Sequence, residues 1–352
     1  MVRSTAVQPK DRKELAPNWK LGPERRVSRR PKTEMTLRGD ASPRPFVKWA
    51  GGKTQLLDQF ELLYPPASQV QRYIEPFVGS GAVFFQVREL LQPKETILAD
   101  GNEELINAYR VVQNDVADLI KALAKHKKGH SQDHYYRVRG QSPKRLDEVA
   151  RAARLIYLNK TCFNGLYRVN SRGEFNVPMG RYKDPPILDE RNLRAVSKAL
   201  AGVKLWVSSF RKTAKHARAG DFIYFDPPYH PISETSYFTA YAVNGNRSHF
   251  SEEDQVDLAK VYRDLAAHGC LVMLSNSDAE FIRKLYVPKS SRTHSAHGIR
   301  IRKVFARRNI NSRAERRGRI REIVVLNYHP PENPSYLTQL FEDDRVGREG
   351  LI

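Results

Sequence analysis

Apolar positions from about residue 45 onward follow two periods that alternate along the chain. Short apolar runs predict strands, and longer stretches with apolar residues three or four positions apart predict helices. Strands are expected to end near Ile74 and to cover 96–99, 203–207, 222–225, 270–274, 299–306 and 320–328. Helices are expected at 54–63, from the glycines near 80 through Leu91, and at 252–267 and 279–286. Alternation of strand and helix predicts an α/β fold with an open, largely parallel sheet.

The alternation stops between residues 115 and 201. Helical patterns at 115–127, 146–158 and 189–200 surround a loop at 159–182 that is rich in Gly, Asn and Arg. We therefore expect a mainly helical domain, 115–201, inserted into a sheet domain made of 43–114 and 202–330. Residues 331–352 are expected to form a C-terminal tail.

Residues 1–42 differ in composition from the rest of the chain. They hold 11 Lys and Arg against 5 Asp and Glu, several prolines and no sustained apolar period. This composition predicts a disordered basic tail that adds non-specific affinity for phosphates. A tail that only aids solubility fits the same composition.

The charge of the whole chain indicates a polyanionic partner. A formal net charge of +21 is typical of proteins that bind nucleic acid, with an anionic membrane surface as the lesser option. No apolar run of about 18 residues and no secretory signal is present, so we expect no membrane span and a cytoplasmic location. The two cysteines, Cys162 and Cys270, predict neither a disulfide framework nor a zinc site, and we expect no metal.

The most informative segment is 221–229, where the apolar run 222–225 leads into Asp226, two prolines and Tyr229. Ligands of α/β sheets bind at the carboxyl ends of strands. Proline lacks an N–H, so the carbonyl of Pro227 can serve as an acceptor. A carboxylate, a carbonyl and an aromatic face suit a flat heterocycle that carries an amino group. The alternative is an ordinary turn, since Asp-Pro-Pro is also common turn chemistry.

A glycine turn follows the strand that ends near Ile74. Gly79 and Gly81 would let the backbone pass close to a ligand and start a helix beside it, although a purely structural turn has the same pattern. Asp100 ends the next strand about 20 residues further on, where an acidic residue binds ribose hydroxyls. A helix N-cap is the alternative role for Asp100, because Glu103 follows three residues later.

The segment 46–54 suggests a P-loop but does not match one. The P-loop needs a glycine five positions before the last Gly-Lys pair, and Val47 stands there. A cationic segment with glycines and Trp49 can still close over a nucleoside that carries a carboxylate.

Five segments together resemble the Dam-type (D12 class) DNA adenine-N6 methyltransferases, over roughly residues 45–328. They occur in the order of that family and are Lys-Trp-Ala-Gly-Gly-Lys (48–53), Glu-Pro-Phe-Val-Gly-Ser-Gly (75–81), Leu-Ala-Asp-Gly-Asn (98–102), the recognition segments 164–168 and 172–178, and Asp-Pro-Pro-Tyr (226–229). The resemblance implies a Rossmann-like methyltransferase sheet. It also implies S-adenosylmethionine as cofactor, contacted by Trp49, Lys53, Phe77, Gly79, Asp100 and Asp226. The tail 1–42 and a small insertion at 245–249 depart from the family.

The chemistry of the segment 226–229 agrees with this resemblance. The lone pair of the adenine amino nitrogen is delocalised into the ring. Acceptors at Asp226 and at the Pro227 carbonyl would localise it and stabilise the developing positive charge. The base cannot be reached inside a duplex, so it must flip out and stack on Tyr229.

The inserted region supplies the candidates for DNA recognition. Arg168 is the residue expected to bind a guanine edge, with a phosphate contact as the alternative open to any arginine. Phe163 could fill the gap left by the flipped base, with a buried core position as the alternative. The basic segment 299–321 is expected to be a phosphate-binding hairpin or else a solvated loop. The expected DNA-contacting residues are Phe163, Asn164, Leu166, Arg168 and Pro178.

These observations predict an enzyme that methylates adenine N6 in duplex DNA, with catalysis by Asp226, Pro227 and Tyr229. The resemblance of residues 159–182 points to GATC as the target. Two other classes remain open: a methyltransferase for cytosine N4 or RNA, and a DNA-binding protein that has the fold without the activity.

Overall fold

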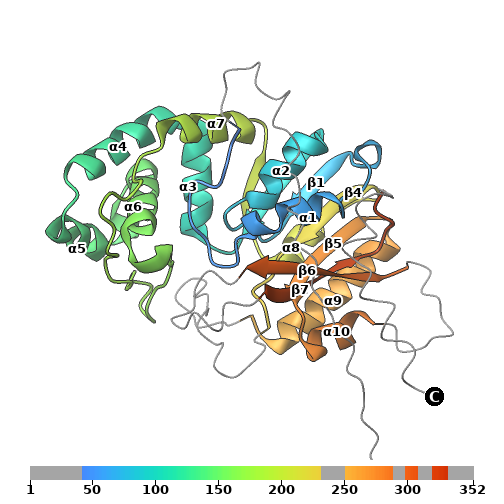
Figure 1. Cartoon of the computed structure of the whole chain (residues 1–352). Helices are drawn as coiled ribbons and strands as arrows, with labels where there is room; N and C mark the ends of the chain where they lie inside the picture. Colours follow the sequence, from blue (N-terminus) through green and yellow to red (C-terminus); the bar gives the residue numbers. More distant parts are fainter. Residues whose placement is uncertain (1–41, 231–249, 288–297, 308–318, 332–352) are drawn as a thin grey trace, which may run out of the picture. The chain divides into compact units, whose positions relative to one another are not determined.

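A seven-stranded mixed sheet forms the centre of the computed structural model, which describes residues 42–230, 250–287, 298–307 and 319–331. The strand order is β3-β2-β1-β4-β5-β7-β6, and the strands β1, β4, β5, β6 and β7 are labelled in Figure 1. The first five strands are parallel, whereas β7 runs antiparallel to both β5 and β6. The bounds are β1 Arg72–Glu75, β2 Glu95–Asp100, β3 Lys204–Val207, β4 Asp221–Phe225, β5 Leu271–Ser277, β6 Arg300–Arg307 and β7 Arg319–Leu326.

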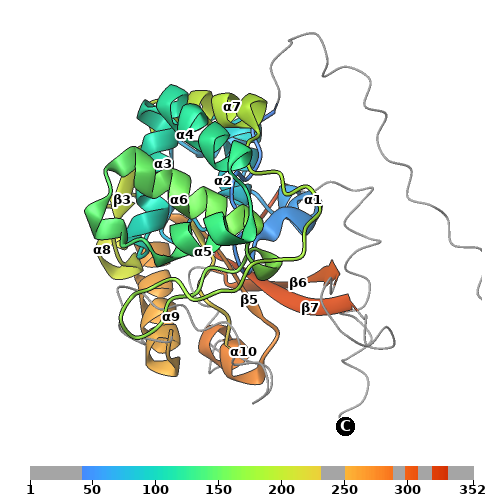
Figure 2. The same ribbon diagram turned by 90° about the vertical axis from the view of Figure 1, so that its left-hand side faces the viewer.

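Ten α-helices lie in the described part of the chain. They are α1 Leu57–Glu61, α2 Ala82–Leu90, α3 Glu103–Asn114, α4 Val116–Lys128, α5 Gln132–Gly140, α6 Glu148–Thr161, α7 Glu190–Leu200, α8 Phe210–Ala214, α9 Glu252–Ala267 and α10 Glu280–Tyr286. Helices α3 to α7 gather beside the sheet, and α8 to α10 lie along it (Figures 1 and 2). None of the helices in the ranges that the structure describes is long and apolar enough to cross a bilayer.

Helices cover both faces of the sheet. Because side chains alternate along each strand, successive residues point into the cores on opposite faces. In β4, Phe222 and Tyr224 pack into the core that includes residues of α1, α2 and α3. Ile223 and Phe225 pack into the opposite core, with residues of α8, α9 and α10. A continuous apolar run is therefore needed in β4, and its carboxyl end emerges between two packed layers.

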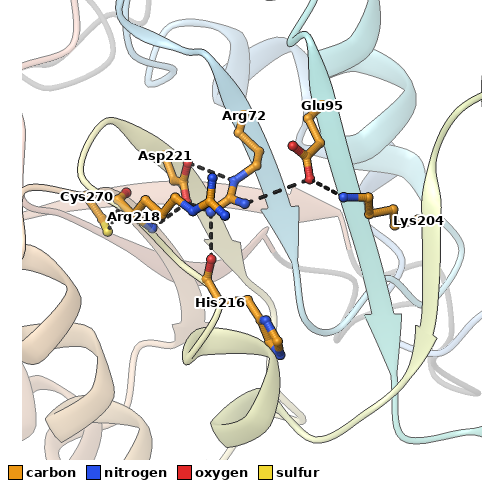
Figure 3. Close-up of polar contacts among 7 residues, drawn as sticks. All are labelled: Arg72, Glu95, Lys204, His216, Arg218, Asp221 and Cys270. Carbon is orange, nitrogen blue, oxygen red and sulfur yellow. Dashed lines mark hydrogen bonds and ion pairs between the residues drawn. The ribbon is translucent and has the colours of Figure 1, made fainter.

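The amino ends of four neighbouring parallel strands are joined by charges of alternating sign (Figure 3). The Arg72 guanidinium donates to both carboxylate oxygens of Asp221, with Nε–Oδ1 3.0 Å and Nη2–Oδ2 2.5 Å. On its other side Glu95 lies 3.8 Å from Arg72 and 2.7 Å from Lys204. Because Arg72 is in register with both Asp221 and Glu95, these ion pairs fix the relative positions of the strands at the end opposite the cavity described below.

The expected strands are all present, and three helices were not anticipated. The unexpected helices are α3, α5 and α8. The expected helix 54–63 is wrong as a single element, because a 3-10 turn at Lys53–Gln55 precedes the short helix α1. The first turn closes through an i to i−3 bond from Leu56 to Lys53, which is the tighter geometry of a 3-10 helix.

The inserted helices α4, α6 and α7 pack against α3, which the sequence placed in the sheet domain. The boundary of the inserted domain at 115 and 201 therefore stays a prediction. Most of the tails 1–42 and 331–352, the insertion 245–249 and residues 308–318 of the expected basic hairpin lie outside the described residues.

Candidate active site

A cavity of about 430 Å³ opens at the carboxyl ends of β1, β2 and β4. Its size falls in the range of small-molecule sites. Four segments line it: residues 49–53, the glycine turn 75–80 with the start of α2, residues 100–102, and residues 226–229. Residues 208–211, Phe250 and Asp254 complete the wall. Segments far apart in the sequence meet here because parallel strands end at the same edge of the sheet.

Asp226 directly follows β4 and lines the cavity. Its Oδ1 accepts from Lys53 Nζ at 2.7 Å and from the Ser275 hydroxyl at 2.8 Å. Burial raises the pKa of Asp226, and the Lys53 ammonium and the Ser275 hydroxyl oppose that rise. No described residue donates a hydrogen bond to Asp226 Oδ2 or to the Pro227 carbonyl. Although Asp226 is ion-paired, it still lines the cavity.

Tyr229 is fixed from two sides. Its hydroxyl donates to Glu322 Oε2 at 2.6 Å, and Lys53 Nζ lies 4.6 Å from the centre of its ring. Burial raises the pKa of Glu322 and is the first cause of the raised pKa of Tyr229. Glu322 lies on β7 and Ser275 on β5, and neither was anticipated. Only the strand order brings them to the segment 226–229.

The glycine turn and Asp100 form one unit on the other side of the cavity. Asp100 accepts from the N–H of Gly79 at 3.2 Å and of Asn102 at 2.9 Å. Burial nevertheless raises the Asp100 pKa to about 6. Gly79 and Gly81 both have positive φ, and a Cβ on Gly81 would stand 2.6 Å from the Tyr109 hydroxyl. The turn therefore requires glycine at position 81 for space as well as for conformation.

The alternative role of Asp100 as a helix N-cap is wrong. Asn102 caps α3, because its side chain accepts from the N–H of Leu105 at 3.0 Å. The Asp100 carboxylate instead braces the turn at Gly79 and borders the cavity.

Aromatic rings make up much of the remaining wall. Trp49 stacks on Tyr167 at 5.4 Å between ring centres, and Phe77 stacks on Phe210 at 5.7 Å. Phe250 contacts both Phe77 and Phe210. Thus all six residues expected to contact the cofactor, namely Trp49, Lys53, Phe77, Gly79, Asp100 and Asp226, line a single cavity. Phe210 belongs to the short helix α8, which the sequence pattern did not indicate.

A third carboxyl group, Glu75, borders the cavity with Asp226 and Asp100. It is buried and accepts from the Tyr73 hydroxyl at 2.8 Å, and burial raises its pKa well above the usual value. The cavity is therefore rich in acceptors, which suits a ligand with positive charge and N–H or O–H donors. Within the described ranges, no three His, Cys, Asp or Glu side chains converge in a way that could hold a metal ion.

The expected DNA-contacting residues lie together in a different place, on the loop after α6. Phe163 N–H donates to the Pro178 carbonyl at 2.9 Å, which joins the two ends of this loop. Phe163 is 51% exposed, so the alternative of a buried core position is wrong. Asn164 has a φ of 56°, the left-handed conformation that places it at a sharp turn before Leu166. Arg168 is exposed and donates through Nε to Asn176 Oδ1 at 2.7 Å.

The strand order, with an antiparallel β7 inserted between β5 and β6, and a cavity at the carboxyl ends of the parallel strands define a Rossmann-like methyltransferase fold. The sequence model for the D12 class N6 adenine-specific DNA methyltransferases matches residues 49–300, and this chain belongs to that family. Its members are enzymes, so the chain is an adenine-specific DNA methyltransferase by family.

The similarity to three named relatives covers nearly the whole length of each of them. The type II methyltransferase M.MjaIII of Methanocaldococcus jannaschii is 44% identical over 300 residues, which are 81% of this chain and 99% of the relative. The DNA adenine methylase of Serratia marcescens is 35% identical over 80% of this chain and 98% of its own length. The DNA adenine methylase of Escherichia coli K12 is 33% identical over 82% and 96% respectively.

Proposed function

We propose that the protein transfers a methyl group from S-adenosylmethionine to the N6 atom of adenine in duplex DNA, within the sequence GATC. The arrangement at Asp226 carries this proposal. Lys53 and Ser275 hold Oδ1, while Oδ2 and the Pro227 carbonyl accept from no described residue beside the ring of Tyr229. Two acceptors that no described residue occupies, next to an aromatic face, match an amino group on a flat base.

The residues around the cavity fit the proposed cofactor. Two backbone N–H groups donate to Asp100 and oppose the rise of its pKa by burial. Its carboxylate would accept from the ribose hydroxyls. Trp49 and Phe77 offer apolar faces, and Gly79 lets the backbone approach the ligand. Lys53 and the carboxylates supply opposite charges for an amino acid group. The bound cofactor would supply an electrophilic methyl group on a positively charged sulfur.

The chain itself would orient and activate the base. Asp226 Oδ2 and the Pro227 carbonyl would each accept one hydrogen of the amino group, which localises the nitrogen lone pair toward the methyl group. Tyr229, held by Glu322, would support the ring. As the nitrogen gains positive charge, the Asp226 carboxylate stabilises it and can take the released proton at Oδ2, since burial already raises the pKa of this group.

The loop after α6 would read the DNA. Phe163 is a large apolar side chain that is about half exposed, as expected for a residue that enters the gap left by a flipped base. Arg168 presents an exposed guanidinium that suits a guanine edge, and Asn164, Leu166 and Pro178 shape the surrounding surface. The resemblance of 164–168 and 172–178 to Dam-type enzymes supports GATC. A DNA substrate supports a cytoplasmic location, at the nucleoid.

The direct test is nucleoside analysis of duplex DNA after incubation with the protein and S-adenosylmethionine, with the modified bases mapped. The proposal predicts N6-methyladenine confined to GATC. If the product is N4-methylcytosine, or if RNA is methylated in place of DNA, the proposed substrate is wrong. If adenine is methylated within another sequence, the proposed reaction stands and GATC as the target is wrong.

A further inference from the structure

Three consecutive polar residues end β5 and are buried: Ser275, Asn276 and Ser277. Buried polar groups are costly unless they are hydrogen-bonded. Two of them contact the loop that follows β4. The Ser275 hydroxyl donates to Asp226 Oδ1 at 2.8 Å, and the Ser277 hydroxyl donates to the His230 carbonyl at 2.9 Å. The two ends of the segment 226–230 are therefore held by β5.

The middle residue reaches the same loop through a glutamine on α9. Asn276 Nδ2 donates to Gln255 Oε1 at 3.0 Å, and Gln255 Nε2 donates to the Pro228 carbonyl at 2.9 Å. Gln255 is only 1% exposed, on a helix whose other buried positions include Leu258 and Tyr262. A carbonyl can only accept, so the direction of both hydrogen bonds is determined.

The two prolines of the loop differ in their contact with Gln255. Neither proline has an N–H, so each can be anchored only through its carbonyl or by packing. The Pro228 carbonyl is occupied by Gln255, and no described residue donates to the Pro227 carbonyl. The Pro228–Tyr229 peptide is thus held by Gln255, while among the described residues the carbonyl of the preceding Pro227–Pro228 peptide has no donor and can face a ligand.

We propose that Gln255, supported by Asn276, is a positioning residue that anchors the Pro228 carbonyl so that the Pro227 carbonyl and Asp226 face the amino group of the target base. This inference rests on the proposed function for its catalytic consequence. A misplacement of about 1 Å can reduce a rate by about 100-fold.

The first variant is Gln255→Leu, compared with Gln86→Leu as a matched control. Gln86 has the same kind of partners away from the loop: Nε2 donates to the Leu57 carbonyl at 3.1 Å, and Oε1 accepts from the Tyr64 hydroxyl at 2.7 Å. We expect Gln255→Leu to lower kcat roughly 10- to 100-fold with little change in KM for cofactor or DNA. The control should keep its kcat. Equal kcat losses in the two variants, or an unchanged kcat in Gln255→Leu, overturn the proposal.

The second variant, Gln255→Glu, gives a readout that a loss of packing would not produce. An ionised Glu would face the Pro228 carbonyl without a proton to donate, whereas the protonated form restores the hydrogen bond. The ratio of its kcat to that of the wild-type protein should therefore increase as pH falls. A ratio that stays flat, or that decreases toward low pH, contradicts the proposal.

Hydrogen exchange separates this inference from the proposed function, because it needs no activity. The amides of Tyr229 and His230 should exchange faster in Gln255→Leu than in the wild-type protein, and Gln86→Leu should leave them unchanged. If exchange is unaltered in Gln255→Leu, the anchoring role fails even when the wild-type protein methylates adenine. If exchange increases but the wild-type protein does not methylate DNA, the anchoring stands and the proposed function fails.

Discussion

Lys53 Nζ lies 2.7 Å from Asp226 Oδ1 and 4.6 Å from the centre of the Tyr229 ring. Lys53 is only 4% exposed, so this ion pair is shielded from the solvent that weakens surface pairs. The ammonium favours the ionised form of Asp226 against the effect of burial. Because it binds Oδ1, Lys53 favours the charged carboxylate without occupying Oδ2.

Removing this ammonium should move the pH dependence of methyl transfer. The proposed reaction needs ionised Asp226, which is present above its pKa and lost as pH falls through it. Lys53→Met removes the contact that lowers this pKa, so the acid limb of the profile should shift to higher pH. The measurement is single-turnover methyl transfer against pH at saturating cofactor. An acid limb that stays in place, or moves to lower pH, contradicts this role of Lys53.

Cofactor affinity should depend on pH through Asp100. Its pKa is raised to about 6, and only the ionised form can accept from both ribose hydroxyls. The Kd for S-adenosylmethionine should therefore increase as pH falls below about 6. Asp100→Asn should weaken binding roughly 10- to 150-fold, the value of a hydrogen bond to a charged group, and should remove the pH dependence. Calorimetric titration between pH 5 and 8 measures both. Unchanged affinity in the variant would place the ribose elsewhere.

Tyr229 should act through its ring more than through its hydroxyl. Stacking of a base on an aromatic side chain contributes about 1–3 kcal/mol, so Tyr229→Ala should weaken capture of the flipped base by about 5- to 150-fold. Tyr229→Phe keeps the ring and loses only the bond to Glu322, so its effect should be smaller. Fluorescence of 2-aminopurine at the target position reports the flipped base. Equal signals from all three proteins would exclude stacking on Tyr229.

The charges at the amino ends of the strands should contribute to stability and not to chemistry. Asp221→Asn leaves the buried Arg72 without its main partner and should cost about 3–5 kcal/mol of unfolding free energy. Lys204→Ala breaks a more exposed ion pair with Glu95 at the end of the same row (Figure 3) and should cost about 1 kcal/mol or less. Chemical denaturation compares the two. Similar losses would show that Arg72 and Asp221 are not an effectively buried pair.

Much of the site could be predicted from the sequence because its residues directly follow apolar runs. The run 222–225 places Asp226 at the edge of the sheet, and the run 96–99 does the same for Asp100. Both therefore line one cavity. The fold class follows from the same alternation of strand and helix.

The partners that arrive from other strands could not be predicted in this way. Ser275, Gln255 and Glu322 meet the segment 226–229 only through the strand order and through helix α9, which are long-range features. Helices α5 and α8 carry too few apolar residues in a helical period to be recognised. The N-cap was considered only as the alternative role of Asp100, from its spacing to Glu103. The helix begins at Glu103 itself, so the cap falls on Asn102, which directly precedes it.

The most direct test of the account is single-turnover methyl transfer to a GATC duplex by Asp226→Ala beside the wild-type protein, with cofactor and DNA binding measured in both. Loss of an acceptor for developing charge should reduce the rate at least about 100-fold while DNA binding persists. A variant that transfers methyl groups as fast as the wild-type protein would contradict the central role of Asp226.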